Sequence, residues 1–164
     1  MKRIALISDT HNYLPPNIFK YLESCDEIWH AGDIGTINIT EQLEQLKPVR
    51  AVYGNIDGQE VRKFHPKTQR FFCEQVDVLI THIGGYPDRY TPEARILLAK
   101  NPPKIFICGH SHILKIIYDK KYNLLHINPG SCGIQGIHKV KTLVRFTIDG
   151  DKIKDMEVVE LGLK

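Results

Sequence analysis

Histidine, aspartate and asparagine residues follow short apolar runs at five points of the chain. The clearest case is the run Ile105–Cys108, which leads through Gly109 to His110 and His112. The earlier runs lead to Asp9 with His11, to Asp33, to Asn55 and to His82. Their oxygen and nitrogen donors suit divalent metal ions of borderline softness. Seven such residues are too many for one catalytic ion with an open position, so the pattern predicts two ions that share a bridging carboxylate.

The elements that position these residues alternate between strand and helix in the first third of the chain. Hydrophobic periodicity predicts strands at 2–8, 26–30 and 49–54 and helices at 16–25 and 39–47. Such β-α-β units form a parallel sheet, and ligands gather at the carboxyl ends of its strands. Because alternate residues of an extended chain point the same way, we expect Asp9 to pair with His11 and His110 with His112.

The remaining two thirds of the chain favours strands. We expect strands at 69–76, 76–82, 105–109, 114–119, 123–127, 141–149 and 152–161, and a helix at 92–100. Asn123 and the pair Gly150–Asp151 supply turn residues, which indicates antiparallel hairpins. The sequence therefore predicts a single α/β domain over residues 1–164, with two sheets and flanking helices.

Composition excludes several classes of protein. Hydrophobic residues make up 42% of the 164 residues and charged residues 25%, which is typical of globular chains and not of disordered or fibrous ones. The net charge of +3 is too small for a dedicated nucleic-acid or membrane surface, but small anionic substrates remain open. The chain carries no signal-peptide or membrane-span pattern, and its four cysteines form no CxxC pair, so we expect a cytoplasmic protein with reduced cysteines.

The ordered series SDTH, GD, GN, TH and GHSH, followed by NPGS at 128–131, resembles the calcineurin-like metallophosphoesterase superfamily. In its small size the chain is similar to the compact bacterial and archaeal phosphodiesterase branch of that family. The resemblance covers residues 4 to 131 and implies a four-layer αββα sandwich of two mixed sheets. It also implies a hydrolase that cleaves phosphodiesters, with a metal-bridging hydroxide as the nucleophile.

Site residues follow from the resemblance position by position. It implies one metal site made of Asp9, His11, Asp33 and His112. It implies a second made of Asp33, Asn55, His82 and His110, so that Asp33 bridges the ions. We expect Asp33, Asn55 and His110 to be the catalytic residues. Mn is the first expectation for the metal, with Fe, Ni, Zn or Co as alternatives. The expected ligands are a small phosphodiester and phosphate as product or inhibitor, and a homodimer or homotetramer is left open.

Two departures from the family pattern bear on the substrate. Many relatives read GNH where this chain reads Gly54-Asn55-Ile56, and isoleucine cannot protonate a leaving group. The small phosphodiesterase branch also commonly lacks this histidine, which favours diesters. Relatives often read HGH where this chain reads His82-Ile83-Gly84, so a second imidazole is missing from the pocket rim. Two other functions stay open: a protein-binding scaffold that retains the fold, and a nuclease.

Other polar residues have structural and functional interpretations side by side. We interpret His65 and His138 as solvated loop residues and His126 as a core residue, while His30 is either a core residue or a support for a metal ligand. Thr40 is the expected cap of the second helix. Asp57 either supports the Asn55 loop or forms a local turn. The tyrosines near the expected site either flank a nucleotide-like group or pack in the core; they are Tyr53, Tyr86 and Tyr90.

Overall fold

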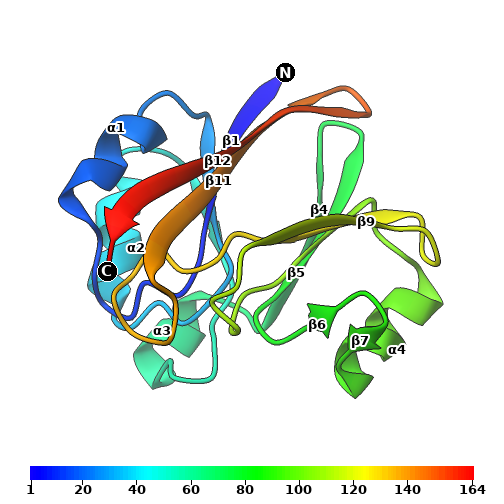
Figure 1. The fold of residues 1–164 in the computed structure, drawn as a ribbon, viewed down its shortest axis with the longest axis horizontal. Coiled ribbons are helices and arrows are strands. Elements are labelled where there is room, and N and C mark those ends of the chain that lie inside the picture. The colour runs from blue at the N-terminus through cyan, green and yellow to red at the C-terminus, as the bar shows by residue number, and fades with distance from the viewer.

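Two five-stranded sheets pack face to face in the computed structural model, which describes residues 1–164 (Figure 1). The first contains, in spatial order, β12 (Lys152–Leu163), β11 (Val140–Asp149), β1 (Lys2–Ile7), β2 (Glu27–His30) and β3 (Val49–Ala51). The second contains β4 (Thr68–Cys73), β5 (Val76–Thr81), β8 (Ile105–Ile107), β10 (Leu124–Asn128) and β9 (Lys115–Asp119). Strands β1, β2 and β3 run parallel to one another, as do β5, β8 and β10, while the other strands of both sheets pair antiparallel.

Short helices cover the outer face of each sheet, so the layers run helix, sheet, sheet, helix (Figure 1). Beside the first sheet lie the 3-10 turn η1 (Pro16–Ile18) and the helices α1 (Phe19–Leu22), α2 (Ile37–Glu44) and α3 (Gln59–Phe64). Helix α4 (Pro92–Lys100) packs on the second sheet. The fold class expected from the sequence, an αββα sandwich of two mixed sheets, is confirmed. No helix is long and apolar enough to cross a membrane.

Strand β1 shows how the sequence builds these layers. Successive side chains of a strand point to opposite faces, so Ile4 and Leu6 enter the core between the sheets, while Ala5 and Ile7 enter the core beneath the helices. All four side chains are fully buried. Burial of each isoleucine or leucine among them contributes about 1.5–3 kcal/mol. A strand that is apolar on both faces is therefore held from both sides, and the loop after it is fixed in place.

Several element boundaries differ from the sequence prediction. The first helix is only the turn η1 and four residues of α1. Helix α2 begins after Thr36 and not after Thr40, and the hydroxyl of Thr40 donates to the Ile37 carbonyl inside the helix. Thr36 does not cap α2 through its side chain, and its hydroxyl instead donates to Oδ1 of Asn12. The sequence did not predict α3 or the small hairpin of β6 (Gly85–Tyr86) and β7 (Arg89–Tyr90).

The carboxyl ends of the parallel strands meet where the two sheets adjoin. Strands β1, β2 and β3 end there in the first sheet, and β5 and β8 end there in the second. The backbone N–H of Gly109, after β8, donates to the His82 carbonyl after β5, and the N–H of Asp9, after β1, donates to the Gly32 carbonyl after β2. These bonds tie the loops of each sheet together at one edge of the sandwich.

Candidate metal centre

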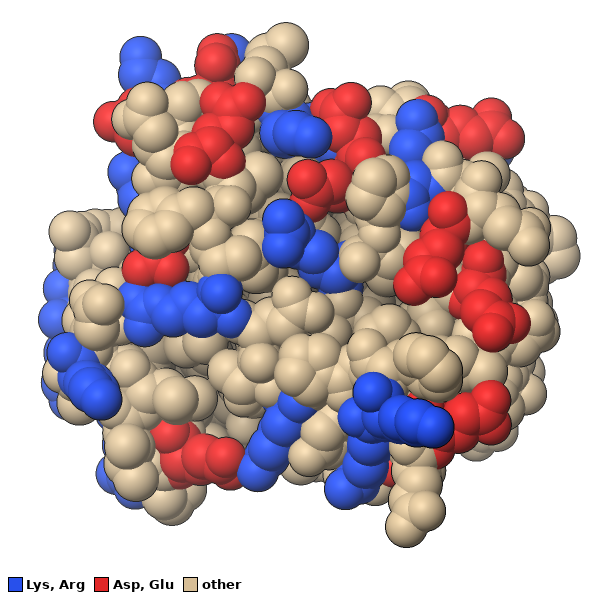
Figure 2. Space-filling view, turned by 180° about the vertical axis from the view of Figure 1, so that it is seen from behind, with Lys and Arg blue, Asp and Glu red and all other residues tan.

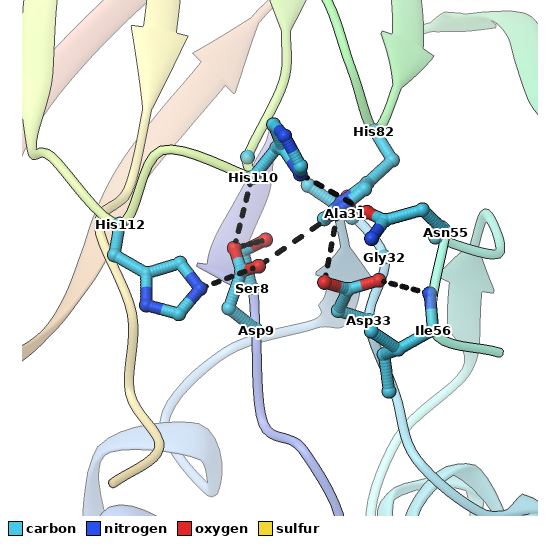
Figure 3. Close-up of polar contacts among 12 residues, drawn as sticks. Ser8, Asp9, Ala31, Gly32, Asp33, Asn55, Ile56, His82, His110 and His112 are labelled. Carbon is cyan, nitrogen blue, oxygen red and sulfur yellow. Dashed lines mark hydrogen bonds and ion pairs between the residues drawn. The ribbon is translucent and has the colours of Figure 1, made fainter. Parts of the chain in front are cut away.

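The five loops bring the seven residues expected from the sequence into one cluster. Figure 3 shows the members of this cluster other than His11. Their ligand atoms form two compact groups, one of Asp9, His11 and His112 and the other of Asp33, His82 and His110. Asn55 lies beside the second group, with its Oδ1 3.0 Å from Nδ1 of His110. Each group takes residues from loops of both sheets. The residues that the sequence singled out therefore lie together, although the five loops are well separated along the chain.

The backbone at the cluster is left-handed, not extended. Five of the seven residues have positive φ angles: 55° for Asp9, 44° for His11, 55° for Asp33, 71° for His110 and 62° for His112. Such angles cost energy in residues other than glycine and concentrate at functional sites. The expectation that His110 and His112 point the same way is therefore wrong, because the chain is not extended there: the two rings enter different groups.

The two carboxylates are held in fixed orientations. Oδ2 of Asp9 accepts hydrogen bonds from the Ser8 hydroxyl at 2.5 Å and the His110 backbone N–H at 3.2 Å, and the whole residue is buried. Oδ1 of Asp33 accepts from the Ile56 N–H at 3.1 Å. Oδ2 of Asp33 lies 3.4 Å from Nε2 of His11 and 3.2 Å from Nε2 of His82. One carboxylate oxygen of Asp33 therefore faces a histidine of each group.

Gly54 allows this approach, because a Cβ at that position would overlap Oδ1 of Asp33. Any larger residue would force the Asn55 loop away from the Asp33 loop. The tight contact between these two loops thus depends on a residue without a side chain.

His82 and His112 have their outer ring nitrogens hydrogen-bonded, which leaves Nε2 directed at the cluster. Nδ1 of His82 donates to the Ala31 carbonyl at 2.7 Å. Nδ1 of His112 lies 3.3 Å from Nδ1 of His138, and Nε2 of His138 donates to the Gly133 carbonyl at 2.8 Å. Since the hydrogen of a neutral His138 is on Nε2, its Nδ1 accepts the hydrogen from His112. Burial lowers the pKa of His138, which favours this neutral form.

His138 is therefore not the solvated loop residue that the sequence indicated. It is partly buried and contacts the ring of His112 edge to face, with ring centroids 5.2 Å apart. Hydrogen bonds of this kind fix the tautomer and orientation of a metal-binding histidine. The sequence held no local signal for this contact, because the two residues lie 26 positions apart.

Unpaired polar atoms provide a direct test of whether the cluster fits metal ions. Oδ1 of Asp9, Nε2 of His11 and Nε2 of His82 are buried and make no hydrogen bond. Their near contacts are with other polar atoms of the cluster, since Oδ1 of Asp9 lies 3.1 Å from Nε2 of His112 and Nε2 of His82 lies 3.2 Å from Oδ2 of Asp33. The three atoms lie close together, since Oδ1 of Asp9 is 3.9 Å from Nε2 of His11 and 3.8 Å from Nε2 of His82. Buried polar atoms are normally paired, so this convergence calls for a ligand. Carboxylate oxygen and imidazole nitrogen are donors that divalent ions accept, and the residues fit such ions.

The charges of the cluster agree with this fit. Burial raises the pKa of Asp33, but its close contact with His82 and the charge of that ring outweigh burial and hold the pKa of Asp33 below its ordinary value. Burial lowers the pKa of His82, yet its contacts with Asp33 and Asp9 bring it above the ordinary value. The close contact of its Nε2 with Oδ1 of Asp9 raises the pKa of His112, and burial lowers the pKa of His110. The lowered pKa of Asp33 thus favours its negative charge, which attracts cations to the cluster.

Two buried residues support the loops from behind. The carboxylate of Asp57 accepts from the backbone N–H groups of Gly54 at 2.7 Å, Ile34 at 3.1 Å and Gly35 at 2.8 Å. It therefore joins the Asn55 loop to the Asp33 loop. Of the two interpretations left open by the sequence, Asp57 has the supporting role and does not merely form a local turn. The ring of His30 accepts from the Gly32 N–H and donates to the Thr10 hydroxyl, so it spans two metal loops.

The remaining residues singled out in the sequence lie outside the cluster. His65 is buried, not solvated, because its Nε2 hydrogen-bonds to the Thr40 hydroxyl at 3.1 Å. His126 is a core residue, as expected, although its Nδ1 has no partner. Tyr90 is also a core residue, and its hydroxyl donates to Asp119. The hydroxyl of Tyr86 bonds to Ser111, and Tyr53 is partly buried beside Asn55.

Comparison with known proteins agrees with this geometry. A family model described as the calcineurin-like phosphoesterase superfamily domain matches residues 1–151. A probable metallophosphoesterase of Methanothermobacter thermautotrophicus is 30% identical over 167 residues, which cover 97% of this chain and 92% of that protein. Vps29 from Chaetomium thermophilum has a TM-score of 0.76 at 15% identity, with 100% of both chains covered. A structure described as a novel archaeal phosphodiesterase has a TM-score of 0.73 at 21% identity, with 96% of this chain and 99% of that chain covered. At such identities the two structures establish the fold alone.

Proposed function

Because the chain belongs to the calcineurin-like phosphoesterase superfamily, we propose that it is a metal-dependent phosphodiesterase with a dinuclear metal centre. The observation that carries the proposal is the convergence of Asp9, His11 and His82, whose buried ligand atoms make no hydrogen bond and face only other polar atoms of the cluster. Asp9, His11, Asp33 and His112 would hold one ion. Asp33, Asn55, His82 and His110 would hold the other. The position of Asp33 Oδ2 between His11 and His82 supports a bridging role for that carboxylate.

Two divalent ions, when bound, supply Lewis acidity toward a phosphoryl group and lower the pKa of the attacking water. The protein residues orient the reaction. Asp33 is held by the Ile56 N–H, so its carboxylate stays fixed while charge moves at the substrate. His110 is exposed at the mouth of the cluster and contacts Asn55, so these two residues would meet the phosphoryl oxygens first. We therefore propose Asp33, Asn55 and His110 as the catalytic residues. Mn is the first metal to test, with Fe, Ni, Zn and Co as alternatives.

The preference for diesters rests on Ile56. This residue follows Asn55, is 47% exposed and carries no group that can protonate a leaving oxygen. A neighbouring residue, Ile83, is 42% exposed and is equally unable to do so. A substrate whose leaving group departs without protonation fits this opening. The archaeal phosphodiesterase of the same fold is consistent with that choice.

The test is hydrolysis of bis(4-nitrophenyl) phosphate and of 4-nitrophenyl phosphate by metal-stripped protein, with each metal added back in turn. We expect metal-dependent turnover that favours the diester and is inhibited by inorganic phosphate. The variant Ile56→His places an imidazole next to Asn55, and we expect it to raise turnover of an alkyl phosphate, whose leaving alkoxide needs a proton, relative to 4-nitrophenyl phosphate by at least about tenfold. Metal-bound protein that hydrolyses neither 4-nitrophenyl compound would refute the proposal.

A scaffold function is the second candidate, because exposed isoleucines flank the cluster. Ile56 follows Asn55, Ile83 follows His82 and Ile113 follows His112, and all three are at least 42% exposed. Apolar side chains grouped in this way are typical of protein-binding surfaces. Full binding of both ions without turnover, together with capture of a partner, would favour this candidate.

A nuclease function has less support. Lys and Arg side chains are interspersed with Asp and Glu on the face shown in Figure 2, and the net charge is only +3. Proteins that bind nucleic acid usually present a continuous basic surface. Cleavage of long DNA or RNA strands by the metal-loaded protein would reverse this order of candidates.

A further inference from the structure

A cavity of about 480 Å³ opens beside the metal cluster. Its wall includes Asn55 and His82 of the cluster, and it extends to Tyr53, Arg62 and Lys67. Cavities that bind small molecules commonly measure roughly 300–1,000 Å³, which is far more than one phosphoryl group fills. If the proposed function holds, a substrate bound at the cluster would thus place one of its ester groups in this cavity.

Arg62 is fixed in the cavity wall with its terminal nitrogens free. Nε donates to the Asp57 carbonyl at 2.7 Å, and the guanidinium lies 4.4 Å from the centre of the Tyr53 ring. The terminal nitrogens of Arg62 donate to no group of the protein. Asp57 is buried and also holds the Asn55 loop, so the guanidinium is anchored to the same support as the cluster.

The charge of the cavity also depends on Arg62. The other cation in the wall, Lys67, pairs with Glu93 at 2.8 Å, so these two charges largely cancel. The guanidinium is left as the unpaired charge. Its planar fork matches two oxygens of a carboxylate or a phosphate, and the ring of Tyr53 reduces the freedom lost on binding.

We propose that this cavity binds one half of the phosphodiester substrate and that Arg62 binds a second anionic group, a carboxylate or a phosphate, on that half. The inference rests on the proposed function for the position of the phosphodiester. It goes further in giving the substrate class: a diester that carries a second negative charge on one of its ester groups.

The test uses two matched dialkylphosphinates, in which P–C bonds replace both ester P–O bonds. One carries a terminal carboxylate and the other the corresponding carboxamide. Binding to the metal-loaded protein is measured by calorimetry, so no turnover is needed. We expect the carboxylate to bind about tenfold to hundredfold more tightly, the range for charge-assisted hydrogen bonds. In Arg62→Met the ratio of the two dissociation constants should fall towards one, and Arg62→Lys should retain part of it.

Lys63→Met is the matched control, because it removes the same charge from the next residue of α3 and lies outside the cavity wall. Its ratio should equal that of the wild type. Equal or undetectable binding of the two compounds to the wild type would overturn the inference, as would a full ratio in Arg62→Met. Failure of the proposed function is a separate result, namely no hydrolysis of the chromogenic diester, and the binding ratio can be measured on a protein that shows no turnover.

Discussion

Removal of the His138 ring should weaken metal binding without unfolding the protein. In His138→Ala the Nδ1–H of His112 loses its acceptor, so the ring can rotate or take the tautomer that blocks Nε2. Loss of such a supporting contact typically lowers metal affinity by about 10–100-fold. The 3.3 Å separation is long for a hydrogen bond between nitrogens, which places the effect at the lower end, about tenfold or 1.4 kcal/mol.

The assay is calorimetric titration of Mn or Zn into metal-stripped protein, with thermal unfolding followed in parallel. We expect one of the two binding events to weaken, because His112 belongs to the group with Asp9 and His11. His138→Gln, which returns an acceptor oxygen, should recover part of the affinity. Lys139→Ala changes an exposed neighbour in the same loop and should bind as the wild type does. Affinity within twofold of the wild type in folded His138→Ala would refute the reasoning.

Three further predictions concern the cluster and its surroundings. Asp33→Asn should bind less metal and lose at least about 99% of phosphodiesterase activity while it stays folded. Elemental analysis measures the bound metal, kinetics the activity and circular dichroism the fold. A fully active variant would contradict the bridging role of Asp33. Asp57→Ala leaves three N–H groups without their acceptor, two of them buried and that of Gly35 partly buried. We expect a loss of about 3 kcal/mol of unfolding free energy in urea, and a loss below about 1 kcal/mol would contradict the support described for Asp57. Burial lowers the pKa of His30 and of His126 to about 4. Between roughly pH 6.5 and pH 4 the unfolded chain therefore binds protons that the folded chain does not. Each of the two residues should thus lower the unfolding free energy by about 2 kcal/mol when the pH falls from 8 to 5. His126→Leu should remove its share of that loss, which urea unfolding at the two pH values will measure.

The order of apolar runs was enough to predict two sheets with flanking helices and the residues that cluster, while the four-layer arrangement was implied by the family resemblance. Apolar runs such as those that end before Asp9 and His82 mark buried strands, and parallel strands bring their carboxyl ends to one edge. The identity of the residues after each strand therefore carried most of the information about the site. Helix α4 was also predicted with its observed bounds, because Thr91 and Pro92 mark its start clearly.

The features that could not be predicted from the sequence depend mainly on contacts between segments that are distant in the chain. His65 and His138 lie in polar stretches, which read as solvated, yet each is fixed by a partner at least 25 positions away. The rings of His110 and His112 separate because both residues adopt positive φ angles, a strained state that no local pattern indicates. Helix α3 buries only Val61, so its periodic signal was too weak to predict it.

The division of each metal group between the two sheets has a mechanical consequence. Asp9 and His11 extend from the first sheet and His112 from the second, while Asp33 comes from the first and His82 from the second. An ion held by either group would cross-link the two sheets. A ligand present at a thousand times its dissociation constant stabilises the folded state by about 4 kcal/mol. The stability of the folded protein in a cell would then depend on the concentration of available metal. Metal depletion would shorten the half-life of the protein as well as stop its catalytic activity.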